Sequence, residues 1–441
     1  MTSLTHGFRI EQDRCDGCLS CMRACPTHAI RVKDGKAHYK PDRCIDCGGC
    51  LPECRSNAIV ATTWAVEDLG RYKFKVAVPS PVLFGQFPAG ITPAHIVDGL
   101  LALGFDAVWD YGVEIGLVIR AIHEYVTNWK GSFPLISISC PVVVRLVQVS
   151  YPRMVDQLVN VQIPREIAGR EAKRRYSEKL GIPRDEIAAI YVTPCQAKTI
   201  SILEPAEGVE SHLDGSLGIS DVYNAIVAFA SIHRDGAEAV RPSTGVRNST
   251  FLRWSLSEGL GHALSRHRYL SVTGLSNVTQ VFDDIERGRL RNVEFLEAYN
   301  CWSGCTGGNL TVANVYLTLS RFHSLISKLP AMDPETAAEV ERRYPNEDFS
   351  LERPIRPRSI RGTSGSLKER VRISQEADAI LKTLPGLNCG LCGSPTCKEL
   401  AKDVSIGDAE RGECLFYSKD RLRQLRKRYI PRPDPGSAPT F

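Results

Sequence analysis

The sequence lacks the signals that mark several common classes of protein. No apolar run precedes the first cysteine motif, so no secretory signal is expected. Neither a G-x-G-x-x-G turn nor a P-loop is present, so no nucleotide or flavin site is predicted. Aromatic residues make up only 7% of the 441 residues. Hydrophobic residues at 43% and charged residues at 24% still exclude wholesale disorder, and the length suggests about three domains.

One stretch, 76–97, has no Lys, Arg, Asp or Glu over 22 residues, which is long enough to span a membrane. Four prolines interrupt it, at Pro79, Pro81, Pro88 and Pro93. Proline breaks the hydrogen bonding of a helix interior, so the stretch is better interpreted as a buried strand, a loop and a helix start. We therefore expect no membrane span and a cytoplasmic protein.

Cysteine, by contrast, is abundant, with 16 in the chain. In a reducing cytosol so many cysteines indicate metal sites rather than disulfides. Eight of them form two runs of C-x2-C-x2-C-x3-C, which is the pattern of a bacterial two-cluster ferredoxin. In that pattern the fourth cysteine of each run ligates the other cluster, so one [4Fe–4S] cluster is assigned to Cys15, Cys18, Cys21 and Cys54, and the other to Cys44, Cys47, Cys50 and Cys25. A zinc module is the alternative, although zinc sites usually use separated C-x2-C pairs.

A third group lies near the other end of the chain and consists of Cys389, Cys392, Cys397 and Cys414. Glycines around these cysteines give the loop room to wrap an inorganic core, and a helix is predicted from about Thr396. The segment resembles the small [4Fe–4S] domain of Rnf-type B subunits and of corrinoid iron–sulfur proteins, which implies a third cluster. Zinc is again the alternative.

The last four cysteines, Cys140, Cys195, Cys301 and Cys305, are scattered along the chain. Predicted strands at 135–139, 188–192 and 293–299 end at or just before three of them. Cofactors of α/β proteins lie outside the carboxyl ends of the strands, so the four thiols could close one site. Four separate buried structural cysteines are the alternative that the spacing leaves open.

The region 72–328 resembles the catalytic domain of the iron-only, or [FeFe], hydrogenases. The resemblance is carried by SISCPVVVRLVQVSYP at 137–152, TPCQAKTIS at 193–201 and EAYNCWSGCTGGNL at 297–310, with VAVPS at 76–80 as a shorter match. It implies that the four scattered cysteines hold a [4Fe–4S] cubane, which this family joins to a two-iron subsite to form its H-cluster. With its extra cluster domain, the chain resembles the accessory and sensory members.

Several positions that serve proton delivery in that family are changed here. Ser139 stands where the family has a proton-relaying cysteine, and a serine hydroxyl is a much weaker acid than a thiol. Ser201 replaces a glutamate of the family's proton path, and Thr193 and Tyr299 replace methionines beside the cluster. Autonomous hydrogenase activity is therefore disfavoured.

Other positions keep the family's contacts to the two-iron subsite. The resemblance implies that Lys198 hydrogen-bonds one cyanide of that subsite and that the loop with Pro79 and Ser80 holds the other, so these three are predicted cofactor-binding residues. Ser139 and Lys198 are catalytic candidates only if the two-iron subsite binds. Trp302, between two predicted ligands, is expected to shield the cubane from water.

Between the ligand positions the predicted strands and helices alternate, which indicates an α/β domain with mostly parallel strands. A helix at 93–103 and a strand at 105–111 belong to it. The predicted domains are an α+β two-[4Fe–4S] ferredoxin domain at 1–63, an [FeFe]-hydrogenase-like domain at 64–345, a linker at 346–366, a small, mostly helical [4Fe–4S] domain at 367–425 and a basic, proline-rich tail at 426–441.

Together these patterns predict an iron–sulfur electron-transfer protein with four [4Fe–4S] clusters inside a larger redox complex. Its expected partners are a ferredoxin-like donor and other hydrogenase or oxidoreductase subunits, in a hetero-oligomer. The alternative is a hydrogen-sensing or slow hydrogenase with a full H-cluster. The formal charge of +5 is weak evidence for a nucleic-acid partner, because each oxidised cluster with its four thiolates would add about −2. No nucleic-acid partner is predicted.

Overall fold

The computed structural model describes residues 6–233, 246–264, 267–358 and 366–417. The chain divides into two compact units. The larger unit holds 6–9, 45–48 and most of 61–358, and the smaller unit holds 10–44, 49–60 and 366–417. The predicted ferredoxin domain at 1–63 thus contributes to both units, while the predicted tail at 426–441 lies outside the described residues.

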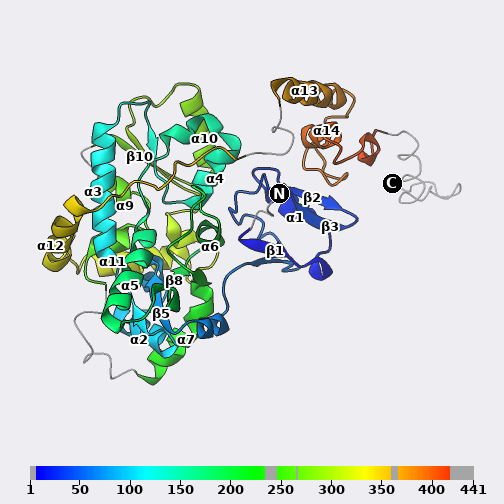
Figure 1. Ribbon diagram of the computed structural model, residues 1–441. Helices are drawn as coiled ribbons and strands as arrows, with labels where there is room; N and C mark the ends of the chain where they lie inside the picture. Colours follow the sequence, from blue (N-terminus) through cyan, green and yellow to red (C-terminus); the bar gives the residue numbers. More distant parts are fainter. Residues whose placement is uncertain (1–5, 234–245, 265–266, 359–365, 418–441) are drawn as a thin grey trace, which may run out of the picture. The chain divides into compact units, whose positions relative to one another are not determined.

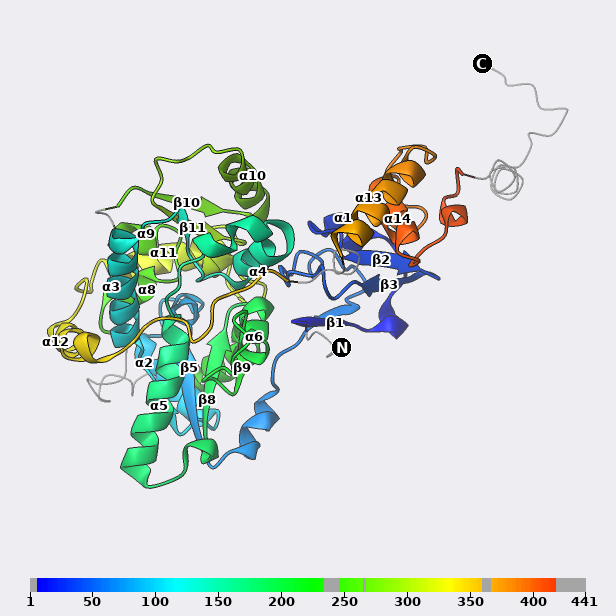
Figure 2. The ribbon, with the colours of Figure 1, turned by 45° about the horizontal axis from the view of Figure 1, so that its top comes forward.

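The larger unit contains a four-stranded, fully parallel sheet in the order β6–β5–β8–β9. Its strands are β5 (Phe74–Pro79), β6 (Ala107–Val108), β8 (Ile187–Thr193) and β9 (Gly215–Gly218). Every residue of β8 is buried, as is typical of a parallel strand covered on both faces. The helices α2 (Pro93–Ala102), α5 (Pro164–Leu180) and α7 (Ile219–Ile232) pack on this sheet, and Figure 2 shows α5 alongside it.

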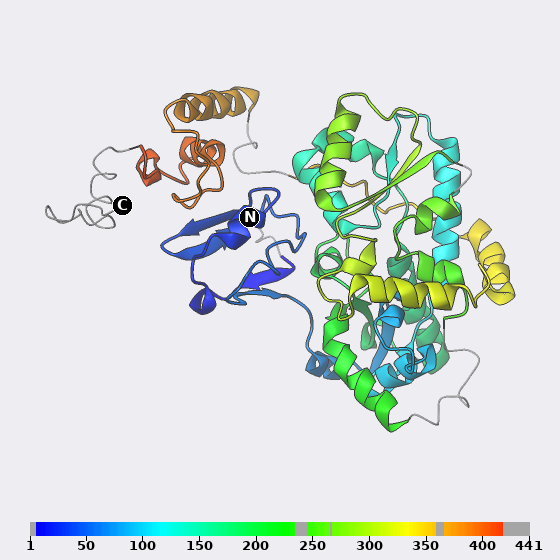
Figure 3. The ribbon, with the colours of Figure 1, turned by 180° about the vertical axis from the view of Figure 1, so that it is seen from behind.

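A second parallel sheet has the strand order β10–β11–β7. Its strands are β10 (Tyr269–Thr273), β11 (Phe295–Tyr299) and β7 (Leu135–Ile136), with α4 (Pro141–Ser150), α9 (Gly259–Ala263) and α10 (Leu275–Glu286) against them. Figures 1 and 3 show the two sheets in different halves of the larger unit. Further helices are α3 (Gly112–Asn128), α6 (Gln196–Leu203), α8 (Ser249–Arg253), α11 (Val315–Ile326) and α12 (Pro334–Arg343). The predicted α/β class with parallel sheets is confirmed.

Two predicted strands are much shorter than expected. The strand predicted at 135–139 ends at Ile136, because the Ser137 hydroxyl accepts a hydrogen bond from the Ser139 backbone N–H and so turns the chain out of the sheet. The strand predicted at 105–111 is reduced to the two residues of β6. There the Asp106 carboxylate accepts a hydrogen bond from the backbone N–H of Lys75, and Asp110 similarly accepts from Gly112 at the start of α3.

The first part of the segment expected to be a linker is packed against the larger unit. Phe349, Leu351 and Ile355 are buried in its hydrophobic core. An ion pair of 2.7 Å between Arg358 and Glu204 holds the end of this part. Apolar side chains at three of seven positions explain why these residues stay on the core despite the prolines and arginines around them.

The smaller unit combines two segments that lie far apart in the sequence. The ferredoxin-like region, 10–44 with 49–60, contains α1 (Ser20–Ala24) and the antiparallel pair β2 (Ile30–Lys33) and β3 (Lys36–Tyr39); β1 (Phe8–Ile10) and β4 (Ile59–Ala61) lie at its ends. The C-terminal region, 366–417, contains α13 (Leu367–Leu381) and α14 (Cys397–Ser405), which pack on each other (Figure 1). Thr396 caps α14 by accepting a hydrogen bond from the Glu399 backbone N–H, as the prediction of a helix from about this residue implies. In the part of the chain that the structure describes, no helix is both long and apolar enough to cross a membrane.

Candidate metal centres

The larger unit brings together the four cysteines that the sequence scatters. Cys140 and Cys195 each occupy the N-cap of a helix, α4 and α6, after a strand of each sheet. Cys301 follows β11 after one residue, and Cys305 begins a short 3-10 turn. Burial raises the pKa of the Cys301 thiol well above its ordinary value, and the charges of the other three cysteines raise it further. Four thiols that influence one another in this way, at the ends of strands, define one site.

The donors around these thiols suit an anionic cluster. The Lys198 ammonium lies 2.9 Å from the Cys305 sulfur, and the Asn300 amide donates to the Cys301 sulfur at 3.5 Å. Burial alone would lower the pKa of Lys198, but the negative charges of Cys305 and Cys195 raise it above its ordinary value, so the side chain stays charged. Four convergent thiols with hydrogen bonds to their sulfurs fit a [4Fe–4S] cubane, which supplies one-electron redox chemistry when bound.

A small cavity of about 20 Å³ lies beside Cys305. Three of the predicted site residues, Ser80, Ser139 and Lys198, line it, whereas Pro79 is the last residue of β5 and does not. Other side chains on its wall are those of Tyr111, Arg165, Tyr191, Trp254 and Tyr299. Lys198 and Arg165 give this cavity two cationic side chains, which suit an anionic group.

Arg165 is a residue of this cavity that the sequence interpretation missed. It is 4% exposed, and its Nη2 donates to the Ser201 hydroxyl at 2.7 Å. Its Nε lies 3.6 Å from Glu166 Oε1, an ion pair that is too long for a hydrogen bond. Pro164 before Arg165 predicts the start of a helix, but nothing in the sequence indicates that Arg165 lines a cavity.

The hydroxyl groups at the changed family positions are already engaged. The Ser139 hydroxyl accepts from the Ser137 hydroxyl at 3.1 Å, and the Ser201 hydroxyl donates to the Lys198 carbonyl. The Tyr299 hydroxyl donates to the Glu297 carboxylate at 2.8 Å, and burial together with the Glu297 charge raises the pKa of Tyr299 well above its ordinary value. These groups are therefore poor acids for a proton relay.

The first predicted ferredoxin cluster has its four thiols together. Burial raises the pKa of Cys21 to about 11, and the charges of Cys15, Cys18 and Cys54 contribute. Backbone N–H groups point at the sulfurs, since Ala58 donates to Cys54 at 3.2 Å. Such N–H···S contacts are what a buried cluster requires of the loop around it.

The second ferredoxin set shows the same local geometry at its Cys25 end. Ala29 donates its backbone N–H to the Cys25 sulfur at 3.1 Å, four residues on, as Ala58 does for Cys54. Of the remaining members, Cys44 and Cys50 belong to the smaller unit, whereas Cys47 belongs to the segment 45–48 of the larger unit.

The third set lies in the C-terminal region of the smaller unit. Burial raises the pKa of Cys392, with contributions from Cys414 and Cys389. Cys397 and Cys414 are buried in one hydrophobic cluster, against which Cys392 packs. The flanking glycines 386, 390 and 393 all have positive φ, so the loop turns in a way that side chains disfavour.

The segment 45–48, which carries Cys47, is fixed directly to the four-cysteine site of the larger unit. The Asn300 amide, next to Cys301, donates to the Cys47 carbonyl at 3.1 Å. The Gln196 amide, next to Cys195, donates to the Asp46 carbonyl at 2.9 Å. The residues that hold this segment are thus the immediate sequence neighbours of the predicted cubane ligands.

A buried ion pair secures the same segment. Asp46 is fully buried and pairs with Arg145 of α4 and with His6. Burial would raise the pKa of Asp46, but the hydrogen bond with His6 and the charge of Arg145 lower it below its ordinary value. The carboxylate therefore stays ionised. Sequence reasoning missed this pair, since nothing local links positions 46 and 145.

Trp302 does not shield the four-cysteine site. Trp302 is 66% exposed, and its indole lies near Gly274, so it is not buried against the cubane site as expected. The expectation from sequence was wrong because position between two ligands does not fix the direction of a side chain at a turn: Ser303 and Gly304 both have positive φ.

Comparisons with protein families agree with this division into sites. Residues 73–230 match the family model of the iron only hydrogenase large subunit, C-terminal domain. Residues 8–55 match a 4Fe-4S dicluster domain, and residues 384–416 match a putative Fe-S cluster family. The chain is therefore an iron–sulfur protein related to the [FeFe] hydrogenases, with a dicluster region before the hydrogenase-like region and a further Fe–S region after it.

Individual relatives are distant and match in part. The NADP-reducing hydrogenase subunit HndD of Solidesulfovibrio fructosivorans is 28% identical over 30% of this chain, which spans 25% of HndD. The periplasmic [Fe] hydrogenase large subunit of Nitratidesulfovibrio vulgaris is 26% identical over 61% of this chain and 69% of its own length. Iron hydrogenase 1 of Clostridium pasteurianum is 22% identical over 48% of this chain and 44% of its own.

Solved structures of [FeFe] hydrogenases are also similar. One, from a study of stepwise H-cluster assembly, has a TM-score of 0.49 and 17% identity, covering 66% of this chain and 94% of that one. A variant of HydA1 from Chlamydomonas reinhardtii has a TM-score of 0.49 and 16% identity, covering 68% and 98%.

Proposed function

We propose that this protein is a cytoplasmic electron-transfer subunit that binds four [4Fe–4S] clusters and moves single electrons within a larger redox complex, without efficient hydrogen turnover. Its partners in this proposal are a ferredoxin-like donor and a catalytic subunit. A subunit role accords with the name of HndD, although this chain spans only a quarter of that protein.

The contact between the Cys47 segment and the four-cysteine site is the observation that carries the proposal. The hydrogen bonds from Asn300 and Gln196 start one residue from Cys301 and Cys195 and end on the segment that carries Cys47. Ile45 is buried in one hydrophobic cluster with Cys140, and the partly buried Cys47 packs against it. Direct contact between the Cys47 segment and the sequence neighbours of two predicted cubane ligands supports electron transfer along this path.

The hydroxyl groups around the cavity argue against efficient proton chemistry. Hydrogen turnover needs a group that exchanges protons near neutral pH at the reacting centre. Ser139 has an ordinary alcohol in place of a thiol, and Ser201 donates to a main-chain carbonyl. What remains at this site is electron storage on the cubane.

The test is an infrared spectrum of protein purified without oxygen after co-expression with hydrogenase maturation proteins, combined with iron analysis. About 16 irons per chain, with no bands in the CO and CN stretching region, would support the proposal. Strong CO and CN bands together with rapid hydrogen evolution would refute it. A matched sample of a known [FeFe] hydrogenase, expressed with the same maturation proteins, shows that the subsite was available.

A hydrogen-sensing or slow hydrogenase with a full H-cluster is the second candidate. It is favoured by the cavity beside Cys305, where Lys198 is charged and Arg165 also lines the wall. Two cations at a buried cavity suit anionic ligands such as cyanide. CO and CN bands with slow turnover would select this candidate.

A further inference from the structure

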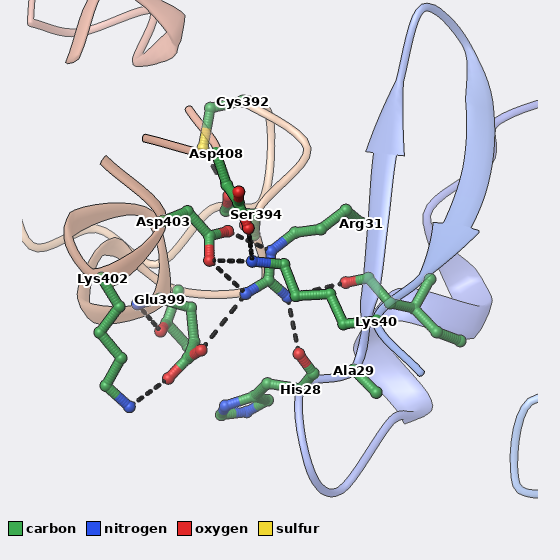
Figure 4. Close-up of polar contacts among 12 residues, drawn as sticks. His28, Ala29, Arg31, Lys40, Cys392, Ser394, Glu399, Lys402, Asp403 and Asp408 are labelled. Atoms are coloured by element: carbon green, nitrogen blue, oxygen red, sulfur yellow. Dashed lines mark hydrogen bonds and ion pairs between the residues drawn. The ribbon is translucent and has the colours of Figure 1, made fainter. Parts of the chain in front are cut away.

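A cluster of buried charges joins the two segments of the smaller unit. At its centre is Arg31 of β2, in the ferredoxin-like region (Figure 4). The Arg31 guanidinium contacts Asp403 of α14, with Nε 2.5 Å from Oδ2, and reaches Glu399 of the same helix at 3.3 Å. All three residues are at most 4% exposed. The guanidinium also donates to the His28 carbonyl at 2.6 Å, so its orientation is fixed from the ferredoxin side.

Two further cations of the ferredoxin-like region complete the cluster. The Lys40 ammonium lies 2.5 Å from Asp403 and 3.1 Å from Asp408, and Arg43 pairs with Glu399 (Figure 4 shows Lys40 with its carboxylates). The hydrogen bonds of Arg31 and Lys40 outweigh burial and lower the pKa of Asp403 below its ordinary value. Three cations from one segment thus meet three carboxylates from the other. We call this set of six residues the Arg31 clamp.

A buried ion pair fixes geometry more than it adds stability. The desolvation of both partners offsets much of their attraction, whereas removal of one partner leaves an uncompensated charge. The Arg31 clamp therefore specifies how α14 sits on β2. A different placement of the C-terminal region would leave several charges buried and unpaired.

The cysteine loop of the C-terminal region lies directly on the ferredoxin-like region. The Gly393 carbonyl, one residue after Cys392, accepts a hydrogen bond of 2.9 Å from the backbone N–H of Val32. A Cβ on Gly393 would lie 1.8 Å from the Val32 carbonyl oxygen, so only glycine allows this approach. A Cβ on Gly390 would lie 3.0 Å from the terminal methyl of Met22.

The same contact is close to the ferredoxin ligands. Met22 follows Cys21 in α1, and β2 starts one residue after Ala29, whose N–H bonds the Cys25 sulfur. Gly390 lies between Cys389 and Cys392 in the sequence. The contact thus joins two loops that each carry predicted cluster ligands.

We propose that the Arg31 clamp holds the two cysteine loops together for direct electron transfer between the C-terminal region and the ferredoxin-like region. We call this contact the electron junction. In this proposal electrons enter or leave the protein at the C-terminal region. The inference rests on the proposed electron-transfer function. One electron moves at the junction, the site that loses it is oxidised and the site that receives it is reduced, with no bond made or broken. An external one-electron donor or acceptor protein would then act at the C-terminal region.

The test uses the full chain with its clusters and compares electron paramagnetic resonance spectra of the reduced protein. Magnetic interaction between the C-terminal cluster and a ferredoxin cluster is expected in the wild type as broadened, fast-relaxing signals. The variant R31M is expected to lose part of this broadening, and K40Q with R43Q, which leaves Arg31 in place, is expected to lose less. The matched control is R372M, which removes an exposed arginine from ion pairs on α13.

Absence of interaction in the wild type, or equal broadening in R31M and wild type at full iron content, would overturn the inference. If R31M loses iron, the broadening in the K40Q and R43Q variant is compared with the wild type instead, because this variant keeps the buried Arg31. Equal broadening in the two would then overturn the inference. These outcomes are independent of the infrared test. CO and CN bands with hydrogen evolution would refute the proposed function even with the junction intact, whereas their absence with no magnetic interaction would refute only the junction.

Discussion

Two buried arginine–aspartate pairs hold predicted cluster loops in this protein, and they are built differently. In the larger unit, Asp46 meets one strong cation, Arg145, with His6 beside it. In the smaller unit, Asp403 meets both Arg31 and Lys40, and Glu399 adds Arg43. Among the contacts described, Arg145 is the strong cation of Asp46, whereas the carboxylates of the Arg31 clamp share three cations. Substitution of one cation should therefore lower the free energy of unfolding more in the larger unit than in the smaller one.

The largest effect is expected for R145M. It leaves the fully buried Asp46 carboxylate without its main cation, so the free energy of unfolding of the larger unit should fall by about 3–5 kcal/mol. All five tryptophans lie in 61–358, so their fluorescence during anaerobic urea unfolding reports this unit. The control K73M breaks an exposed pair with Glu186 and should lose at most about 1 kcal/mol. Equal losses in both variants would mean that the Asp46 pair is not a special anchor.

The substitution G393A should have the next largest effect. Gly393 and Gly407 both have positive φ, so an alanine at either position carries left-handed strain of about 1–2 kcal/mol. Only at Gly393 does the new Cβ meet a backbone oxygen, and nothing lies within 4 Å at Gly407. We expect G393A to destabilise the smaller unit by about 1–3 kcal/mol more than G407A. Amide hydrogen exchange of β2 and α14, followed by mass spectrometry, measures the difference, and indistinguishable exchange would argue against the close approach.

R31M should cost less than R145M, because Lys40 and Arg43 still face the carboxylates. We expect a loss of about 2 kcal/mol in the smaller unit, against about 1 kcal/mol or less for R372M. Exchange of the Val32 amide, which bonds the Gly393 carbonyl, should rise in R31M only. A loss as large as that of R145M would show that the clamp does not share its charges.

The smallest effect concerns the pH dependence of the Arg31 clamp. Burial opposes but does not overcome the hydrogen bonds of Arg31 and Lys40, so the pKa of Asp403 is lower in the folded chain than in the unfolded one. Its contribution to stability is then complete above about pH 4 and is lost as the pH falls further, through the folded pKa. The difference in Val32 exchange between D403N and wild type should accordingly shrink in acid. A difference that grows as the pH falls would reverse the assigned sign.

The sequence predicted the local parts of these sites well and the distant parts poorly. Cysteine loops such as 15–21 and 389–397 have a fixed short spacing, because each loop must hold three thiols around one cluster. Cys140 and Cys305 lie far apart, so spacing alone left them ambiguous until the family motifs were considered. Convergence of their thiols required the two parallel sheets. The α/β class and a strand at this position were predicted, but β7 is shorter than the predicted 135–139.

The charged anchors were missed altogether. Arg31 and Asp403 are 372 positions apart, and Arg145 and Asp46 are 99 apart. The sequence does not indicate which residue pairs with a given charged residue, and most charged residues are solvated. Only burial in the folded chain distinguishes these four from the many exposed charges.

The two cysteine runs of the ferredoxin-like sequence repeat with an offset of 29 residues, from Cys15 to Cys44 and from Cys25 to Cys54. This duplication has a consequence for how the protein is assembled. Because the two halves are similar in sequence, either half could in principle bind the C-terminal region or the residues around Arg145. Position 31 in the first half corresponds to Val60 in the second, and position 46 in the second corresponds to Gly17 in the first. Each anchoring charge thus occurs in one half only. The first half can therefore make the contacts of Arg31, and only the second half can make those of Asp46.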